Sequence, residues 1–137
     1  MSAFQKTLNA LGLHRRELRA WAMYDFANSA FMTIIITAVF PAFFDGFATA
    51  GRDDAGELYS GITWVAILVS AVVSLLLGAV ADALGAQKRL LAILTVIGSA
   101  ATAGMFFIPQ GGWLVAGALF ATANIAIMCA FVCYNAM

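Results

Sequence analysis

Three long stretches of this chain carry no charged side chain, and they constrain its fold more than any other feature. They run from Phe26 to Phe44, from Leu58 to Ala81 and from Leu90 to Met137, with lengths of 19, 24 and 48 residues. A helix needs about 20 apolar residues to cross the hydrocarbon core of a bilayer. Because 64% of all residues are hydrophobic and only 10% are charged, the composition is that of an integral membrane protein.

The third stretch is too long for a single crossing. As one helix it would reach about 72 Å at about 1.5 Å per residue, against a hydrocarbon core of about 30 Å. Its one cluster of helix-breaking residues is Pro109-Gln110-Gly111-Gly112. We therefore predict an all-α polytopic membrane helix bundle with four transmembrane helices. In a transmembrane domain over residues 20–137, these helices cover about 20–44, 58–81, 90–108 and 113–136.

The basic residues predict how the helices are oriented. Six of the seven lie on one side of the predicted spans, and Arg52 alone lies on the other. The positive-inside rule makes the side with six residues cytoplasmic, so the N-terminus faces the cytoplasm. A bacterial inner membrane is the default location. The six residues are Lys6, Arg15, Arg16, Arg19, Lys88 and Arg89.

Residues 1–19 precede the first predicted span as a cytoplasmic leader. The spacing of Phe4, Leu8, Leu11 and Leu18 is compatible with an amphipathic helix on the membrane surface and equally with a short flexible segment. At the other end, the last predicted helix has no basic residue after it. We therefore expect the intact protein to continue beyond Met137.

Asp25 is the one ionisable residue inside a predicted span, and Asn28 follows it at i+3 on the same helical face, with Tyr24 beside it. A charged residue costs about 2.5 to 3.5 kcal/mol at the centre of a span and is by default a functional candidate. Tyr24, Asp25 and Asn28 are thus candidates for a substrate pathway or for coupling to protons. Because Asp25 lies near the start of the span, a structural pair with Arg19 or a cap at the membrane interface remains open.

The fourth predicted helix contains one amide near its middle. Asn124 lies about 16 Å along this helix from Trp113, close to the bilayer midplane where transporter sites are found. It is a candidate substrate contact, and an amide that bonds a neighbouring helix is the alternative. Cys129 and Cys133 lie one turn apart without further ligands, so we interpret them as small buried side chains and predict no metal site.

A short charged loop joins the second and third predicted helices. Gly78, Asp82 and Gly85 form a Gly-x-x-x-Asp-x-x-Gly pattern that is followed by Lys88 and Arg89. This pattern resembles the signature loop of the major facilitator superfamily. There, the first glycine lets the second helix meet a helix of the other half of the protein, and the acid ties the two halves together in one state of the transport cycle. The resemblance implies that these five residues form a conformational-switch loop.

The loop departs from the family pattern at two positions. A basic residue is expected directly after the acid and directly after the second glycine, where this chain has Ala83 and Ala86. Lys88 and Arg89 would substitute for them from displaced positions. In the family, the second basic residue often pairs with an acid on the fourth helix, and this chain has no acid there. As an alternative, Lys88 and Arg89 act only as determinants of topology.

The first predicted helix carries a longer and more specific resemblance. The string Tyr24-Asp25-Phe26-Ala27-Asn28-Ser29, with Val39-Phe40-Pro41 further along, resembles the opening of the vacuolar (autophagy-related) amino-acid effluxer-like branch of the superfamily. The resemblance implies the amino-terminal part of a twelve-helix secondary transporter, whose six-helix halves rock about a central site. It also implies efflux or exchange of solutes by alternating access, with amino acids as the suggested class.

The partners that this interpretation implies are the lipid bilayer, a small-molecule solute, protons and the remaining helices of the same protein. The sequence has no phosphate-binding glycine loop, no nucleophile elbow and no nucleic-acid-binding patch. We therefore expect no enzyme, no cofactor and no nucleic-acid partner. Two other classes remain open, namely a complete four-helix exporter that works as a dimer and a membrane scaffold subunit that transports nothing.

Overall fold

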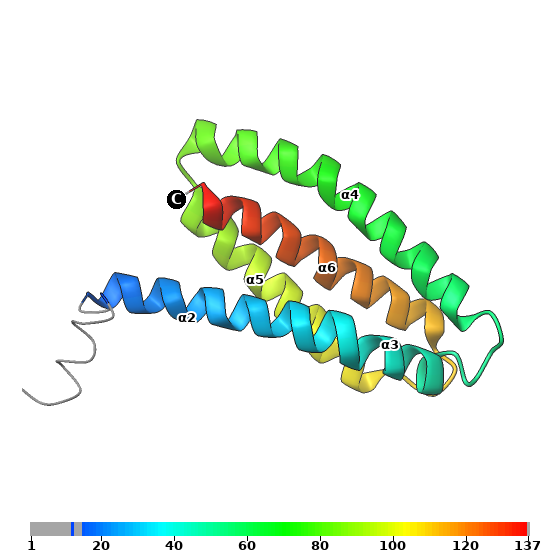
Figure 1. Cartoon of the computed structure of the whole chain (residues 1–137). Helices are drawn as coiled ribbons and strands as arrows, with labels where there is room; N and C mark the ends of the chain where they lie inside the picture. The colour runs from blue at the N-terminus through cyan, green and yellow to red at the C-terminus, as the bar shows by residue number, and fades with distance from the viewer. Residues whose placement is uncertain (1–11, 13–14, 137) are drawn as a thin grey trace, which may run out of the picture. The chain divides into compact units, whose positions relative to one another are not determined.

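The computed structural model describes Gly12 and residues 15–136, and every regular element within them is helical (Figure 1). Four helical runs in this part of the chain are long and apolar enough to cross a membrane, namely Arg16–Ala48, Ala55–Leu84, Gln87–Phe107 and Trp113–Asn135. This confirms the predicted all-α fold with four spanning helices. The elements are α2 (Arg16–Ala30), η1 (Phe31–Val39), α3 (Phe40–Phe43), η2 (Phe44–Ala48), α4 (Ala55–Leu84), α5 (Gln87–Gly104), η3 (Met105–Phe107) and α6 (Trp113–Asn135).

The observed helices extend beyond the charge-free stretches. α2 begins at Arg16, inside the predicted leader, and α4 contains Glu57 in its first turn and Asp82 in its last. Charged side chains at helix ends reach the aqueous interface, so they interrupt a charge-free stretch without ending the helix. The predicted breaker is observed, because residues 108–112 separate η3 from α6. The leader positions Phe4, Leu8 and Leu11 lie outside the described residues.

The chain divides into two compact units, and the boundary lies between Val39 and Phe40. In the first unit, α2 continues into η1, a π-helical segment in which no residue is buried. The wider π-helical turn pairs residues five apart, and Thr37 Oγ1 adds a hydrogen bond of 3.1 Å to the carbonyl of Met32. π-Helical turns inside longer helices are uncommon and are frequently found at functional sites.

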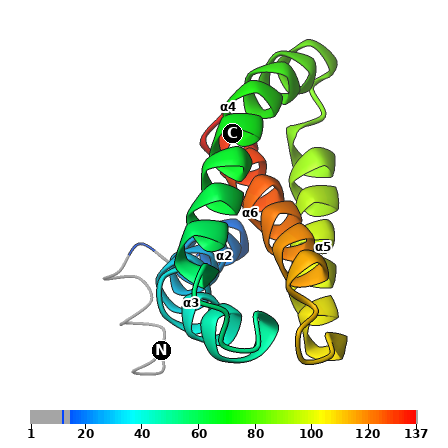
Figure 2. The ribbon, with the colours of Figure 1, turned by 90° about the vertical axis from the view of Figure 1, so that its right-hand side faces the viewer.

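The second unit is built around α6. Figure 2 shows α6 between α4 and α5, and α6 packs on both while α4 and α5 touch each other little. Most of its buried residues are small, and small residues let helices approach closely where lipid supplies no hydrophobic driving force. The large apolar side chains of α4 and α5, such as Leu75 and Val96, are exposed. The small buried residues of α6 are Ala116, Gly117, Ala123, Ala126, Cys129, Ala130 and Cys133.

A side chain of α4 packs closely against α6 at Gly117. A Cβ atom added to Gly117 would lie 2.5 Å from Cδ1 of Ile62, which is too close for two carbon atoms. Towards the other end of the same pair of helices, a Cβ added to Gly78 would lie 3.5 Å from Cγ1 of Val132, an ordinary van der Waals distance. The helix pair is therefore tight near Gly117 and looser near Gly78.

Aromatic side chains hold one end of the second unit together, and we call this the aromatic end (residues 40–59 and 105–120). The rings of Phe40 and Phe120 stack with centroids 3.9 Å apart and an interplanar angle of 8°. Phe44 and Tyr59 complete the cluster, with Tyr59 5.8 Å from Phe120 between centroids. A backbone hydrogen bond of 3.2 Å from the N–H of Gly111 to the carbonyl of Phe47 joins η2 to the turn before α6.

An ion pair and a cation–π contact lie at the aromatic end. Arg52 donates two hydrogen bonds to Asp54, of 2.8 and 2.7 Å, and its guanidinium lies 5.5 Å from the ring centroid of Trp113. The hydrogen bond from Arg52 lowers the pKa of Asp54, and the same bond raises the pKa of Arg52. Since both side chains are exposed to water, this pair fixes geometry more than it contributes stability.

Candidate functional site

The loop between α4 and α5 is a tight reversal. α4 ends at Leu84, and Gly85 follows with φ +58° and ψ 30°, in the left-handed region. The N–H of Ala86 bonds the carbonyl of Ala81 at 3.1 Å, so the last carbonyls of α4 are partly satisfied by the turn itself. Residues with a Cβ rarely adopt this conformation. The left-handed backbone conformation thus explains why the motif has a glycine at position 85.

Asp82 lies in the last turn of α4, and its carboxylate Oδ1 accepts a hydrogen bond of 3.1 Å from Nε2 of Gln87. Lys88 and Arg89 follow in the first turn of α5, exposed, and neither forms an ion pair with any residue that the structure describes. The partner of the loop acid is therefore a neutral amide. Sequence reasoning missed Gln87, because the resemblance directed attention to the basic residues on either side of it.

The first glycine of the motif lies on the face of α4 that meets α6. Gly78 is half-buried beside Val132, within the same chain. An alanine would fit at this position without displacing Val132. Packing within the described residues thus gives no reason for a glycine here.

The candidates of the first predicted helix lie on α2, in the first unit. Asp25 is exposed, Tyr24 is half-buried, and Asn28 is the buried residue of α2, at 5% exposure. No hydrogen-bond partner reaches Oδ1 of Asn28 within the described part of the chain. Asp25 forms no ion pair with Arg19, so the structural pairing considered from the sequence is not observed among residues 15–136.

Asn124 lies in the middle of α6, in the second unit, and is 4% exposed. Its Oδ1 is buried and has no hydrogen-bond partner within the described residues. Leaving a buried acceptor unpaired costs about 1 to 3 kcal/mol. The alternative considered from the sequence was an amide that hydrogen-bonds a neighbouring helix, and within the described residues Oδ1 accepts no such bond.

The two cysteines are free thiols, buried in α6 as predicted. Cys129 and Cys133 lie on the same helix as Asn124, one and a half and two and a half turns after it, but not on its face. Within the residues that the structure describes, no group of three or more metal-ligating side chains occurs.

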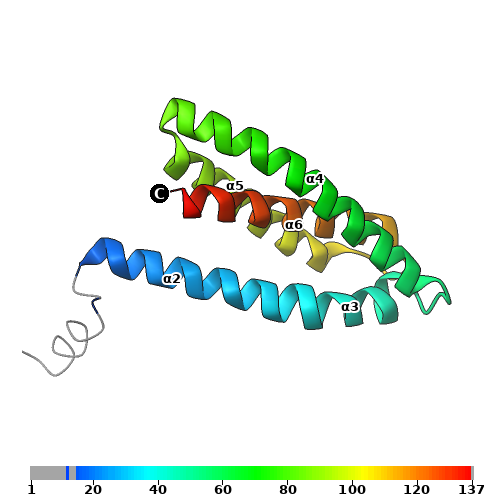
Figure 3. The same ribbon diagram turned by 45° about the horizontal axis from the view of Figure 1, so that its top comes forward.

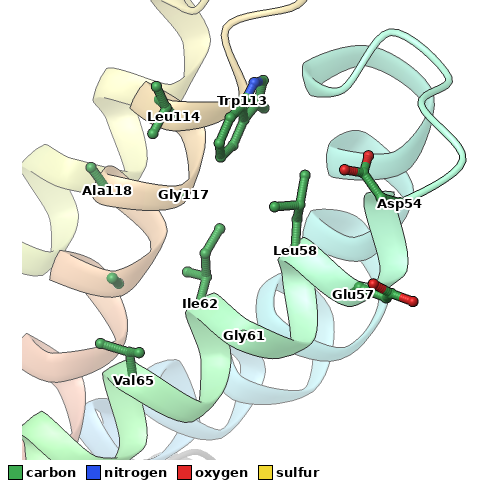
Figure 4. A pocket seen from close by; sticks show the side chains of 11 residues that line it. Asp54, Glu57, Leu58, Gly61, Ile62, Val65, Trp113, Leu114, Gly117 and Ala118 are labelled. Atoms are coloured by element: carbon green, nitrogen blue, oxygen red, sulfur yellow. The ribbon is translucent and has the colours of Figure 1, made fainter.

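An apolar groove runs between α4 and α6 near the aromatic end (Figure 4). Leu58, Ile62 and Val65 line it from α4, and Leu114 and Ala118 line it from α6. Its volume is about 570 Å³. The sequence did not predict this groove, because it depends on how two helices distant in sequence pack together.

A second hollow lies at the opposite end of the second unit, which we call the basic end (residues 78–89 and 132–136). Residues 84–89 line this hollow together with Ala136 from the end of α6, and its volume is about 810 Å³. Figure 3 shows the end of α6 beside the turn from α4 to α5. Three of the five residues of the loop motif line this hollow, namely Gly85, Lys88 and Arg89. Asp82 does not line it but accepts a hydrogen bond from its lining residue Gln87.

Comparison with known proteins gives one family and one curated relative. Residues 60–137 match the family described as "Vacuole effluxer Atg22 like". The uncharacterized MFS-type transporter YxiO of Bacillus subtilis (strain 168) is 32% identical over 124 residues, which are 88% of this chain and 29% of the relative. The chain thus spans less than a third of the length of this relative. No solved structure matches the chain.

Proposed function

The chain belongs to the family of Atg22-like vacuole effluxers, and from this premise we propose that it serves as part of a secondary transporter that moves small solutes by alternating access. Its four helices that can span a membrane support this proposal, as does its similarity to an MFS-type transporter. Transport by rocking halves needs no covalent chemistry, so the proposal includes no enzymatic step. Efflux or exchange is the proposed mode, with amino acids as the substrate class.

The buried, unpaired Oδ1 of Asn124 is the observation that most directly supports a contact with the transported solute. An acceptor without a partner near the middle of a spanning helix is costly unless another group satisfies it. We propose that a solute donates a hydrogen bond to Oδ1 of Asn124 during transport. The ammonium group of an amino acid is such a donor, since it carries three N–H bonds and a positive charge.

The loop at the basic end is proposed as the conformational switch, with Gly78, Asp82, Gly85, Lys88 and Arg89 as its residues. The exposed hydrogen bond between Asp82 and Gln87 supports this role, since water competes for both groups and the carboxylate can exchange the amide for another donor. During the cycle, Asp82 would leave Gln87 for a partner outside residues 15–136. The loop then faces the cytoplasm, as does the N-terminus, in a bacterial inner membrane.

Asp25 is proposed as the proton-coupling group, with Tyr24 and Asn28 along the same pathway. Asn28 is buried with an unpaired oxygen on the same helix, so α2 presents a second acceptor near the carboxylate. A carboxylate that gains and loses a proton during transport would link solute movement to the proton gradient. The proposal places coupling on the first unit and solute contact on the second.

Transport measurements on the protein made from the whole reading frame that contains residues 1–137 test the role of Asn124. In proteoliposomes, we expect Asn124→Leu to lower amino-acid uptake roughly tenfold, which corresponds to one lost hydrogen bond. Thermal stability should not fall, because leucine removes the unpaired oxygen. The matched control is Thr122→Val on the same helix, where the hydroxyl only bonds the carbonyl of Ala118. Uptake by Asn124→Leu at the wild-type rate contradicts the proposed contact.

The same assay with an imposed pH gradient tests coupling. We expect uptake by the wild-type protein to respond to the gradient and uptake by Asp25→Asn to lose that response. Full activity of Asp25→Asn, with an unchanged response to the gradient, removes the basis for proton coupling. Absence of transport of any amino acid by the wild-type protein rejects the proposed substrate class.

A further inference from the structure

Two strongly polar side chains are buried in the helix pair of α4 and α6. Ser70 on α4 is 5% exposed, and Asn124 on α6 is 4% exposed. Apart from two cysteines and one tyrosine, every other buried residue of these two helices is an alanine, a glycine or a phenylalanine. Hydrogen-bonding groups are therefore rare in this interface, and two of them come from its two different helices.

Two contacts define the register of α4 and α6, which run side by side in the same direction (Figure 1). Cδ1 of Ile62 lies against Gly117 near the start of both helices. Further along both helices, Cγ1 of Val132 lies beside Gly78. The direction and the register of the pair are thus fixed at two separate levels.

Ser70 and Asn124 lie midway between these two contacts. Ser70 is eight residues after the first contact residue of α4, and Asn124 is seven residues after that of α6. At a rise of about 1.5 Å per residue, their heights along the pair are almost equal. Seven residues make two turns, so Asn124 lies on the face of α6 that meets α4. Ser70 is buried on α4, whose main packing partner in the second unit is α6.

Both side chains offer an oxygen acceptor at this height. Oγ of Ser70 donates its hydrogen to the carbonyl of Ala66, one turn earlier, and accepts no hydrogen bond within the described residues. A hydroxyl oxygen has two acceptor lone pairs, and it becomes a better acceptor when its own hydrogen is already donated. Oδ1 of Asn124 is the second acceptor, and it also lacks a partner there.

We propose that Ser70 is a second solute contact, and that its Oγ and the Oδ1 of Asn124 accept two N–H bonds of one ammonium group. This inference rests on the proposed function, from which it takes the ammonium solute. An ammonium with two or more N–H bonds can donate to both oxygens, whereas one with a single N–H bond can donate to only one. The pair therefore selects solutes by their number of N–H donors. Both oxygens are buried in the present arrangement, and the site opens when α4 and α6 separate during the transport cycle.

Competition for uptake tests this selectivity, in proteoliposomes with the protein made from the whole reading frame. The labelled solute is the amino acid with the fastest uptake among those with a primary amine. The competitors are its N-methyl and N,N-dimethyl derivatives, whose ammonium groups carry two N–H bonds and one. In the unchanged protein, the N,N-dimethyl form should compete roughly tenfold more weakly, because it loses one of two hydrogen bonds. Competition by the unmodified amino acid measures the effect of one methyl group without loss of a contact.

The variant Ser70→Ala should reduce the difference between the two derivatives from tenfold to about one, because a single acceptor is satisfied by either of them. The matched control is Ser74→Ala, one turn later on α4, where the hydroxyl bonds the carbonyl of Ala71 at 3.1 Å. This control should keep the tenfold difference. A purely structural role of Ser70 would change the rate of uptake and leave the difference unchanged, and that result overturns the inference.

The behaviour of Asn124→Leu separates this inference from the proposed function. If Asn124→Leu lowers uptake while Ser70→Ala keeps the tenfold difference, the contact at Asn124 stands and Ser70 does not belong to it. Equal competition by both derivatives in the unchanged protein likewise rejects a site with two acceptors, whatever the effect of Asn124→Leu. If the unchanged protein transports no amino acid with a primary amine, the proposed substrate class fails, and this inference fails with it.

Discussion

The two ends of the second unit are held by different forces. At the aromatic end, Phe40 stacks on Phe120, a backbone bond joins Phe47 to Gly111, and Arg52 bridges Asp54 and Trp113. At the basic end, one exposed hydrogen bond joins Asp82 to Gln87, and the neighbouring cations lack ion-pair partners in the described structure. Packing therefore fixes the first end, while the second end keeps charge available for other partners.

This difference has a physical basis in the side chains that each end uses. Stacked aromatic rings gain dispersion energy only in one close arrangement, so they hold helices in a fixed register. Exposed charges interact over longer distances and accept several geometries, at a small gain for each. We therefore expect substitutions at the aromatic end to affect stability and those at the basic end to affect binding and switching.

The largest expected effect on stability is from Phe120→Ala. Phe120 is 1% exposed and contacts both Phe40 and Tyr59, so its removal leaves a cavity between α3, α4 and α6. We expect the free energy of unfolding in mixed micelles to fall by about 3 kcal/mol. The control Phe107→Ala removes a ring that is 82% exposed and should change it by less than about 0.5 kcal/mol. Similar losses in both variants would show that the cluster does not fix this end.

The next largest effect is expected from a substitution at one of two glycines in the pair of helices α4 and α6. Gly117→Ala forces its new Cβ towards Cδ1 of Ile62, and we expect a loss of about 1 to 3 kcal/mol in unfolding free energy. Gly78→Ala meets Val132 only at an ordinary distance and should be neutral, or should stabilise by up to about 1 kcal/mol through helix propensity. The double variant Gly117→Ala with Ile62→Val lacks Cδ1 at position 62. It should recover most of the unfolding free energy that Gly117→Ala loses. If Gly78→Ala is the more damaging variant, the tight approach lies at the basic end instead.

Gln87→Ala should have a smaller effect. It removes the exposed hydrogen bond to Asp82, so we expect at most about 1 kcal/mol of lost unfolding free energy. Hydrogen exchange of residues 82–89 should nevertheless increase, because this bond is the side-chain contact that closes the loop. Unchanged exchange in this loop would mean that Gly85 alone determines its conformation.

The smallest effect is the response of the aromatic end to acid. The hydrogen bond from Arg52 lowers the pKa of Asp54 in the folded state. The contribution of the pair is therefore fully present above the unfolded pKa, near 3.8, and is lost as the pH falls through the lower folded pKa. In a Trp21→Phe and Trp64→Phe background, Trp113 fluorescence should change with a midpoint below 3.8. Arg52→Gln should raise that midpoint, and an unchanged midpoint would show that Arg52 does not perturb Asp54.

The sequence by itself determined the features that the bilayer demands. A spanning segment must satisfy its backbone internally and exclude charge, so four spans and the turn at Pro109 to Gly112 could be predicted from local composition. The resemblance of the charged loop and of the first helix identified the family correctly. Gly85 could also be predicted as a turn residue, because its conformation depends only on the local backbone.

Only the tertiary structure decided which side chains meet. The stacking of Phe40 on Phe120, the approach of Ile62 to Gly117 and the position of α6 between α4 and α5 join residues that are far apart in the chain. Asn124 was a candidate from its depth, but its buried oxygen without a partner is a property of the packed helices. Composition predicts which segments enter the bilayer, because the solvent acts on each segment separately. Contacts depend on the relative rotation and distance of helices, which no single segment contains.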